Sequence, residues 1–269
     1  MGQEASKPRP GTELRVIGAG LPRTGTASFS EALAILLDGP VYHGGTQIFN
    51  REPAHIKAWI SCWEKTPIRN SKDHDHIMKN VEEIFDGYAA TTDTPGAQFV
   101  PELLEKFPDA KVICTVRDPE AWVKSMDATA NKSLLWFLWI ILLPLPTVRH
   151  FPKYVDVLQR GRWSELYMPS GDPSTHSTAV YDRHIAWLKK VVPEDQLVFF
   201  DVRDGWGPLC QALNVKVPDV PFPRINDAKA MDEFANKQMM DGLKAWAKIL
   251  GVATALGGVF YVSMSRLTA

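Results

Sequence analysis

The stretch RVIGAGLPRTGTASFSEAL, residues 15–33, decides the fold class of this 269-residue chain. It begins with apolar residues typical of a buried strand, continues through a glycine-containing loop and ends with the apolar spacing of a helix. Such a loop presents backbone N–H groups at the positive end of the helix dipole, so it can hold a phosphate. Gly20 and Gly25 have the spacing of a nucleotide-binding loop, but Thr26 stands where that motif has lysine.

Segments typical of strands and of helices alternate along the rest of the domain. Apolar runs predict strands within 14–20, 39–45, 88–95, 110–116 and 196–202. Helices are predicted between them, among them 28–37 and 179–192. This alternation predicts an α/β fold of three layers, in which helices cover both faces of a central parallel sheet.

Three polar segments follow predicted strands, at 20–28, 91–95 and 117–125. Sheets of this kind bind ligands at the carboxyl ends of their strands. We therefore expect the three segments to meet at one edge of the sheet, although they are far apart in the sequence.

The first of these segments supplies donors for an anionic group. Arg23 adds a fixed positive charge, and the loop adds backbone N–H groups and hydroxyls at the start of a helix. A tight turn without a ligand is the alternative. The residues expected to bind are Arg23, Thr24, Gly25, Thr26, Ala27 and Ser28.

The 117–125 segment suggests a second phosphate site. Arg117 ends a predicted strand, and Asp118 and Pro119 are typical of a helix N-terminus. Ser125 shares a helix face with Asp118, so its hydroxyl can point back toward Arg117. A guanidinium and a hydroxyl together suit a phosphate. Taken alone, the same residues could form a helix start with a surface ion pair.

The segments GLPRTGTASF (20–29) and VICTVRDPEAWVKSM (112–126) together resemble the sulfotransferase family that uses 3′-phosphoadenosine 5′-phosphosulfate, especially a branch common in fungi. Residues 204–227 are similar to the same branch, so the resemblance spans about 14–228. It implies a sulfotransferase fold similar to that of P-loop nucleotide-binding proteins. It also implies that the first loop binds the 5′-phosphosulfate, while Arg117 and Ser125 bind the 3′-phosphate.

Under this resemblance the loop needs no lysine, because no γ-phosphate is hydrolysed and Arg23 neutralises the phosphosulfate. Many cytosolic members carry lysine at this position. Arginine keeps the charge but cannot give up a proton, so we expect Arg23 to stabilise the leaving phosphate electrostatically.

The proton acceptor also departs from the cytosolic pattern. Those members have Thr-His-x-Pro at the end of the preceding strand, whereas this chain has TDTP at 92–95. Asp93 therefore stands where the family's catalytic histidine would be, and we expect its carboxylate to take the proton of an attacking hydroxyl. The alternative is that Asp93 caps the next turn.

Two further residues are candidates for the site. His43 follows the short strand and could be an auxiliary base, line the acceptor pocket or be structural. Arg224 lies in the closing segment and could reach the 3′-phosphate or the adenine. No metal is expected, because the run KDHDH at 72–76 has no distant partners and the chemistry needs none.

Composition limits the classes of partner. The net charge of −1 argues against general binding of nucleic acid. Cys62, Cys114 and Cys210 are odd in number and far apart, which fits a reducing compartment and argues against a disulfide framework or a zinc site.

The sequence predicts a flexible arm at 1–12, the α/β domain at 13–228 and a C-terminal helix with a membrane anchor at 229–269. Gly2 and Ser6 fit the pattern for N-myristoylation. Residues 249–264 carry no charge, and a helix from Ala245 onward would be about 30 Å long, which suits a bilayer core. A helix packed on the domain is the alternative.

These ends predict a membrane-associated protein whose catalytic domain faces the cytosol. A second apolar run, SLLWFLWIILLPLP at 133–146, could line an apolar acceptor pocket, dip into a membrane or form a buried helix.

The predicted function is transfer of a sulfuryl group to a hydroxyl of a hydrophobic small molecule or lipid. The alternatives are a P-loop kinase or hydrolase, and a non-catalytic membrane-tethered protein of the same fold. The sequence does not predict an oligomeric state.

Overall fold

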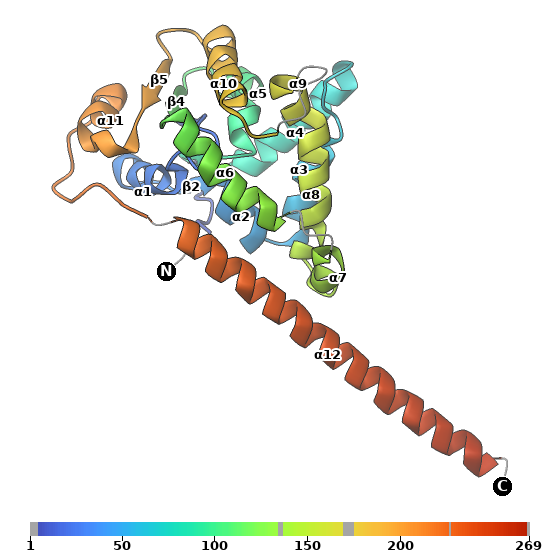
Figure 1. Cartoon of the computed structure of the whole chain (residues 1–269). Coiled ribbons are helices and arrows are strands. Elements are labelled where there is room, and N and C mark those ends of the chain that lie inside the picture. The colour runs from blue at the N-terminus through green and yellow to red at the C-terminus, as the bar shows by residue number, and fades with distance from the viewer. Residues whose placement is uncertain (1–4, 134–136, 169–174, 226, 268–269) are drawn as a thin grey trace.

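At the centre of the computed structural model lies a parallel sheet with the strand order β2-β3-β1-β4-β5 (Figure 1). The structure describes residues 5–133, 137–168, 175–225 and 227–267. The strands are β1 (Val16–Gly18), β2 (Val41–His43), β3 (Ala90–Thr92), β4 (Lys111–Thr115) and β5 (Leu197–Phe200). Each neighbouring pair in this order is parallel, which confirms the predicted α/β class.

The α-helices before residue 137 are α1 (Thr26–Leu37), α2 (Gly44–Asn50), α3 (Pro53–Trp63), α4 (Ser71–Phe85), α5 (Val100–Lys106) and α6 (Pro119–Ser133). Those after it are α7 (Leu138–Leu142), α8 (Phe151–Leu158), α9 (Ser164–Tyr167), α10 (Thr178–Val191), α11 (Trp206–Leu213) and α12 (Asp227–Leu267). Short 3₁₀ turns are η1 (Gly96–Gln98), η2 (Val148–His150) and η4 (Val202–Asp204), and a π-helical turn is η3 (Gln159–Trp163).

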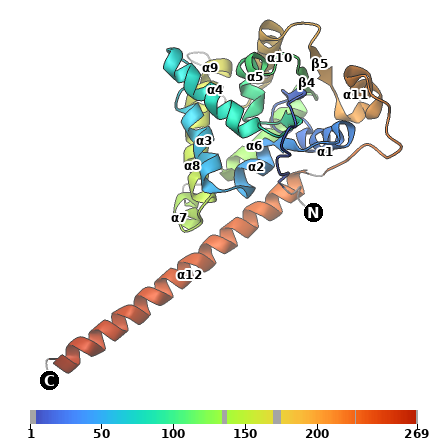
Figure 2. The same ribbon diagram turned by 180° about the vertical axis from the view of Figure 1, so that it is seen from behind.

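Helices cover both faces of the sheet, as Figures 1 and 2 show from opposite sides. Successive strand residues point to opposite faces, so each strand contributes to two cores. Val16 of β1 packs with Phe29 of α1 and Trp206 of α11. Its neighbour Ile17 packs in the other core, with Trp59 of α3. The predicted three-layer architecture is therefore confirmed.

The strand order positions the functional segments. β1 lies between β3 and β4, with Val16 opposite both Ala90 and Lys111. Since the three strands are parallel and in register, the loops that follow them leave the same edge of the sheet. The segments 20–28, 91–95 and 117–125 consequently start side by side.

Part of the N-terminal segment 1–12 lies against the domain. The Ser6 hydroxyl donates to the carbonyl of Val41 at 2.5 Å, and the Arg9 N–H donates to the carbonyl of Gly87 at 2.8 Å. Gly2, the predicted acylation site, lies outside the described residues.

Helix α12 leaves the domain as one long rod (Figures 1 and 2). Its first half contacts the domain, where the Phe234 ring lies 5.2 Å from that of Phe49. Further along, the Trp246 indole donates to the carbonyl of Ile140 in α7 at 2.8 Å. Residues 247–258 are exposed.

The predicted membrane anchor is wrong. In the part of the chain that the structure describes, no helix is both long and apolar enough to cross a membrane. The side chains of 259–264 lie outside the described residues. Three predictions that depend on this anchor are therefore also wrong. They are the transmembrane helix, the membrane as a partner, and a membrane-associated location with the catalytic domain facing the cytosol.

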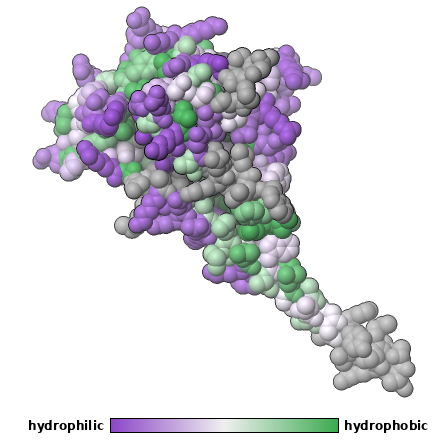
Figure 3. Space-filling view, viewed as in Figure 1, coloured by the Kyte–Doolittle hydropathy of each residue, from purple (hydrophilic) through white to green (hydrophobic). Residues whose placement is uncertain are grey.

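The apolar run 133–146 is not a buried core helix. Its described part contains α7, in which Leu142 is buried while Trp139 and Ile140 are more than half exposed, as is Leu143 directly after the helix. Helix α7 packs on α12, and Figure 3 shows hydrophobic residues gathered where the long helix leaves the domain. Residues 134–136 lie outside the described part.

Candidate active site

The loop between β1 and α1 has the geometry of an anion cradle. Gly25 precedes α1 with a φ of 93°, a left-handed conformation that glycine adopts without strain. At Gly20 the loop passes so close to β4 that an added Cβ would lie 1.9 Å from the Thr115 hydroxyl oxygen. No described side chain caps the N-terminus of α1, so the N–H groups of its first turn remain available for an anion.

The predicted ligand-binding residues of this loop have different roles in the fold. The hydroxyl of Thr24 donates to the carbonyl of Leu21 at 2.7 Å and lies 2.6 Å from the Thr115 hydroxyl. The backbone N–H of Thr24 donates to the same carbonyl of Leu21 at 3.3 Å. Thr24 therefore braces the loop against β4. Thr26, Ala27 and Ser28 form the first turn of α1, where their N–H groups face the N-terminal end of the helix.

Two arginines converge on the loop between β1 and α1, residues 19–25, which the resemblance assigns to the sulfuryl donor and which is called the donor loop below. Arg117, two residues after β4, donates from Nη1 to the carbonyl of Arg23 at 2.8 Å. Arg23 has a φ of 70° and donates from Nε to the Ser125 hydroxyl at 3.2 Å. Ser125 thus contacts Arg23, in addition to the orientation toward Arg117 that the sequence predicts for its hydroxyl. Both guanidinium groups and this hydroxyl gather beside the loop between β1 and α1.

The start of α6 holds Arg117 in place. The Asp118 carboxylate accepts the Ala121 N–H at 2.8 Å, as expected for an N-cap. The N–H of Arg117 donates to the Tyr181 hydroxyl at 3.0 Å. The Trp122 indole donates to the carbonyl of Pro22 at 2.9 Å, which ties α6 to the donor loop.

Asp93 follows β3 and faces the donor loop. Its φ of 71° lies in the left-handed region, and the residue is only 8% exposed. One carboxylate oxygen accepts the Thr94 N–H at 2.7 Å, and the other accepts the Thr26 hydroxyl at 3.2 Å. The backbone carbonyl of Asp93 accepts the Ala97 N–H at 3.0 Å, so the residue also shapes the next turn. Both roles considered for Asp93 are compatible with this geometry.

His43 lies beside this carboxylate. Its Nδ1 is 3.9 Å from Oδ2 of Asp93, and the residue is buried. Neither ring nitrogen has a hydrogen-bond partner among the described residues. His43 is therefore placed to contact a group that approaches Asp93.

An aromatic cluster near Asp93 was not predicted from the sequence. The Trp63 ring lies 4.8 Å from Phe99 and 6.5 Å from Tyr154. Burial and the nearby Asp93 carboxylate both raise the pKa of Tyr154 above its ordinary value. These aromatics come from α3, α8 and the start of α5, and no local pattern links such distant segments.

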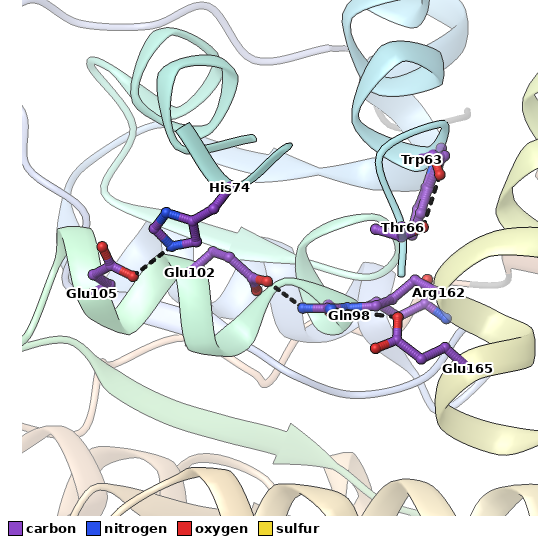
Figure 4. Close-up of polar contacts among 8 residues, drawn as sticks. All are labelled: Trp63, Thr66, His74, Gln98, Glu102, Glu105, Arg162 and Glu165. Carbon is purple, nitrogen blue, oxygen red and sulfur yellow. Dashed lines mark hydrogen bonds and ion pairs between the residues drawn. The ribbon is translucent and has the colours of Figure 1, made fainter. Parts of the chain in front are cut away.

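The remaining candidates differ in position. Arg224 is exposed, but the next residue, Ile225, donates its N–H to the Ser28 hydroxyl at 2.9 Å, so the closing segment lies against α1. The histidines of 72–76 begin α4, where His74 contacts Glu105 at 2.9 Å (Figure 4). Within the described ranges, no three His, Cys, Asp or Glu residues are grouped to hold a metal ion.

Comparison with known proteins agrees with this geometry. The sequence matches the family described as “Sulfotransferase domain” over residues 15–231, which include the donor loop, Asp93 and Arg117. It is also similar to Ava biosynthesis cluster protein M of Aspergillus versicolor, with 30% identity over 258 residues. That alignment covers 92% of this chain and 96% of the relative. The chain therefore belongs to the sulfotransferase domain family.

Proposed function

We propose that the protein transfers a sulfuryl group from 3′-phosphoadenosine 5′-phosphosulfate to a hydroxyl of an apolar small molecule or lipid. One observation carries the proposal: the carboxylate of Asp93 is hydrogen-bonded to Thr26, within the first turn of the donor loop helix. A potential proton acceptor thus lies directly beside an anion cradle. Membership of the family supports a sulfotransferase in general terms.

The phosphosulfate compound has two separate anionic ends, and the site offers a set of hydrogen-bond donors for each. The N–H groups at the start of α1, together with Arg23, would hold the 5′-phosphosulfate. Arg117 and Ser125 would hold the 3′-phosphate through charge-assisted and hydroxyl hydrogen bonds. Arg224, on the closing segment beside Ser28, is exposed and is the candidate contact for the adenine end.

In the proposed reaction, Asp93 takes the proton of the acceptor hydroxyl as its oxygen attacks sulfur. A new O–S bond forms, and the bond between sulfur and the bridging oxygen of the 5′-phosphate breaks. Adenosine 3′,5′-bisphosphate leaves. The Arg23 guanidinium and the N–H groups of α1 stabilise the negative charge that develops on the departing phosphate.

The surroundings of Asp93 support an apolar acceptor. Tyr154 lies within electrostatic range of the carboxylate and belongs to the aromatic cluster with Trp63 and Phe99. Aromatic side chains favour apolar or aromatic ligands. The name of the relative from Aspergillus versicolor refers to a biosynthesis cluster, which supports a small-molecule acceptor.

A nucleoside-triphosphate kinase or hydrolase is the second candidate, because Asp93 resembles the acidic magnesium ligand that follows a strand in such enzymes. Two motif positions oppose it. Thr26 replaces the lysine, and Ala27 replaces the serine or threonine that would bind Mg²⁺.

Calorimetric titration of the full chain separates these functions. Adenosine 3′,5′-bisphosphate should bind at least tenfold more tightly than ADP with Mg²⁺, and Arg117→Ala should abolish this preference. Arg160→Ala is the control, because Arg160 forms an exposed pair with Asp156 at 2.8 Å. Preference for ADP with Mg²⁺ would favour a kinase or hydrolase, and binding of neither would favour a non-catalytic member of the family.

A further inference from the structure

A buried ion pair lies on the far side of the turn that carries Asp93. Arg162 of η3 and Glu102 of α5 are 6% and 4% exposed and contact each other directly through Nη2 and a carboxylate oxygen (Figure 4). The Arg162 guanidinium also lies 5.4 Å from the centre of the Phe99 ring. Glu165 is a more distant partner, at 3.5 Å from Nη1.

Stability alone is a weak explanation for this pair. Removing two charges from water costs several kcal/mol per ion, and a buried pair often does no better than apolar residues of the same volume. The pair fixes the orientation of the arginine side chain, because a guanidinium group presents its N–H donors in a fixed planar fork. With Nη2 held by Glu102, Nε of Arg162 donates to the backbone carbonyl of Gln98 at 3.1 Å.

Gln98 ends the turn that begins at Asp93. Within it, the Ala97 N–H donates to the carbonyl of Asp93 at 3.0 Å, and the Gln98 N–H donates to that of Pro95 at 2.9 Å. The left-handed φ of Asp93 costs about 1 kcal/mol or more, so the surroundings must enforce it. Thr26 contacts the near end of this turn, and Arg162 contacts its far end.

The same segment of chain also reaches the donor loop. Tyr167, at the end of α9, lies 2.8 Å from Nδ1 of His184. Nε2 of His184 lies 2.7 Å from the carbonyl of Ala19, the residue before Gly20. Burial lowers the pKa of His184 to about 4, so its ring is neutral near pH 7. Because a carbonyl only accepts, Nε2 carries the proton and Nδ1 accepts the Tyr167 hydroxyl.

Residues 159–167 are thus fastened to both halves of the site. We propose that Arg162 is a positioning residue that holds the turn 93–98 and so sets the Asp93 carboxylate at its working distance from the donor loop. This inference rests on the proposed function, in which Asp93 receives the acceptor proton. Arg162 touches neither donor nor acceptor in this scheme and acts only through the Gln98 carbonyl.

The test compares Arg162→Lys with Arg160→Lys in the full chain. Lysine keeps the positive charge at 162 but lacks the planar fork that serves Glu102 and Gln98 together. Arg160 lies in the same π-helical turn, but its ion pair with Asp156 is exposed, so it is a matched control. A second variant, Arg162→Met with Glu102→Leu, removes both deeply buried charges, so neither remains as an unpaired buried ion. Glu165 loses its contact with Arg162, but its side chain is 33% exposed and can be hydrated, so this variant guards against loss of folding.

Two measurements are made on each variant. The first is hydrogen–deuterium exchange of residues 93–99 with adenosine 3′,5′-bisphosphate present, which reports the turn whether or not turnover is detected. The second is sulfate release from the phosphosulfate donor with water as acceptor. Water attacks sulfur, the bond to the phosphate oxygen breaks, Asp93 takes the proton, and bisphosphate and sulfate leave.

We expect Arg162→Lys and the double variant to exchange at least tenfold faster over 93–99 and to lower kcat for sulfate release at least tenfold, because a small misplacement of a reacting group is costly. The KM for the donor and the affinity for the bisphosphate should stay within about twofold, and Arg160→Lys should match wild type in both measurements. Wild-type exchange over 93–99 in the folded double variant would overturn the inference. Failure of the unmodified protein to bind the bisphosphate would instead overturn the proposed function.

Discussion

The donor side and the base side of the site are built in different ways. The donor loop is one continuous stretch, and its anion-binding shape follows from its own glycines and from the helix that begins at Thr26. The proposed base is a single carboxylate, that of Asp93, which is hydrogen-bonded to Thr26, 67 residues away. The turn that follows it is held at its far end by Arg162, through the carbonyl of Gln98. The donor side should therefore tolerate distant changes, whereas the base side should not.

Asp93→Asn is the most direct way to test this contrast and should have the largest effect. Asparagine keeps the shape and one acceptor oxygen but is not a base, so turnover should fall about a thousandfold. Affinity for adenosine 3′,5′-bisphosphate should remain within about twofold, because the arginines and the α1 N-terminus are intact. Sulfate release and calorimetry measure the two quantities. Near-normal turnover in this variant would remove Asp93 from the mechanism.

Arg117→Ala should have the opposite signature. It removes a charge-assisted donor from the 3′-phosphate and the hydrogen bond to the Arg23 carbonyl, so the bisphosphate should bind about a hundredfold more weakly. Turnover at saturating donor should change only a few-fold. Calorimetry of Arg117→Ala beside Arg117→Lys checks this, with lysine expected to recover part of the affinity. An unchanged affinity would mean that the second anion site lies elsewhere.

The same contrast explains what could be predicted from the sequence. The strand, loop and helix around Gly25 are consecutive, and the cap at Asp118 is local, so both were predicted correctly. The hydrogen bond between Ser125 and Arg23 was not predicted, because it depends on how α6 is tied to the donor loop. Residue spacing in a helix predicts which face a side chain lies on, but not which residue on another element it contacts.

On the base side, the location of Asp93 after β3 and the approach of its segment to the first loop were predictable, but the individual side-chain contacts were not. The contact of Asp93 with Thr26 joins two loops through the sheet order, and the Arg162–Glu102 pair joins η3 to α5, so neither leaves a local pattern. At the C-terminus, the absence of charge over 249–264 predicts a membrane span. That prediction is wrong, because no helix among the described residues is long and apolar enough to cross a membrane.

The histidine that links the two sides should make stability depend on pH. Burial lowers the pKa of His184 to about 4, so the unfolded chain binds its proton more readily than the folded one. Stability is therefore lost as pH falls from about 6.5 toward 4. When the pH falls from 7 to 5, protonation linked to this histidine should lower the free energy of unfolding by about 2 kcal/mol, which is about twentyfold in the folding equilibrium.

Urea unfolding at pH 7 and pH 5 measures this loss. In His184→Gln, the loss of stability between pH 7 and pH 5 should be smaller by about 2 kcal/mol than in the unmodified protein. Tyr167→Phe keeps the histidine and should retain the loss, which makes it the matched control. His55, whose pKa is also lowered to about 4, should maintain a residual pH dependence in both variants. An identical pH dependence in His184→Gln and the unmodified protein would contradict the assignment.

Ser28→Ala should have the smallest effect and sharpens the contrast on the donor side. The Ser28 hydroxyl accepts the Ile225 N–H at 2.9 Å, which fastens the closing segment to α1. Losing one hydrogen bond of about 1 kcal/mol should weaken bisphosphate binding about fivefold and speed hydrogen exchange at residues 220–225. Ser61→Ala, which removes a hydroxyl directed at Ala58 in α3, should change neither. Because the turn 93–98 is fastened separately, its exchange should stay at the wild-type rate in Ser28→Ala, and a faster rate there would show that the two sides of the site are one cooperative unit.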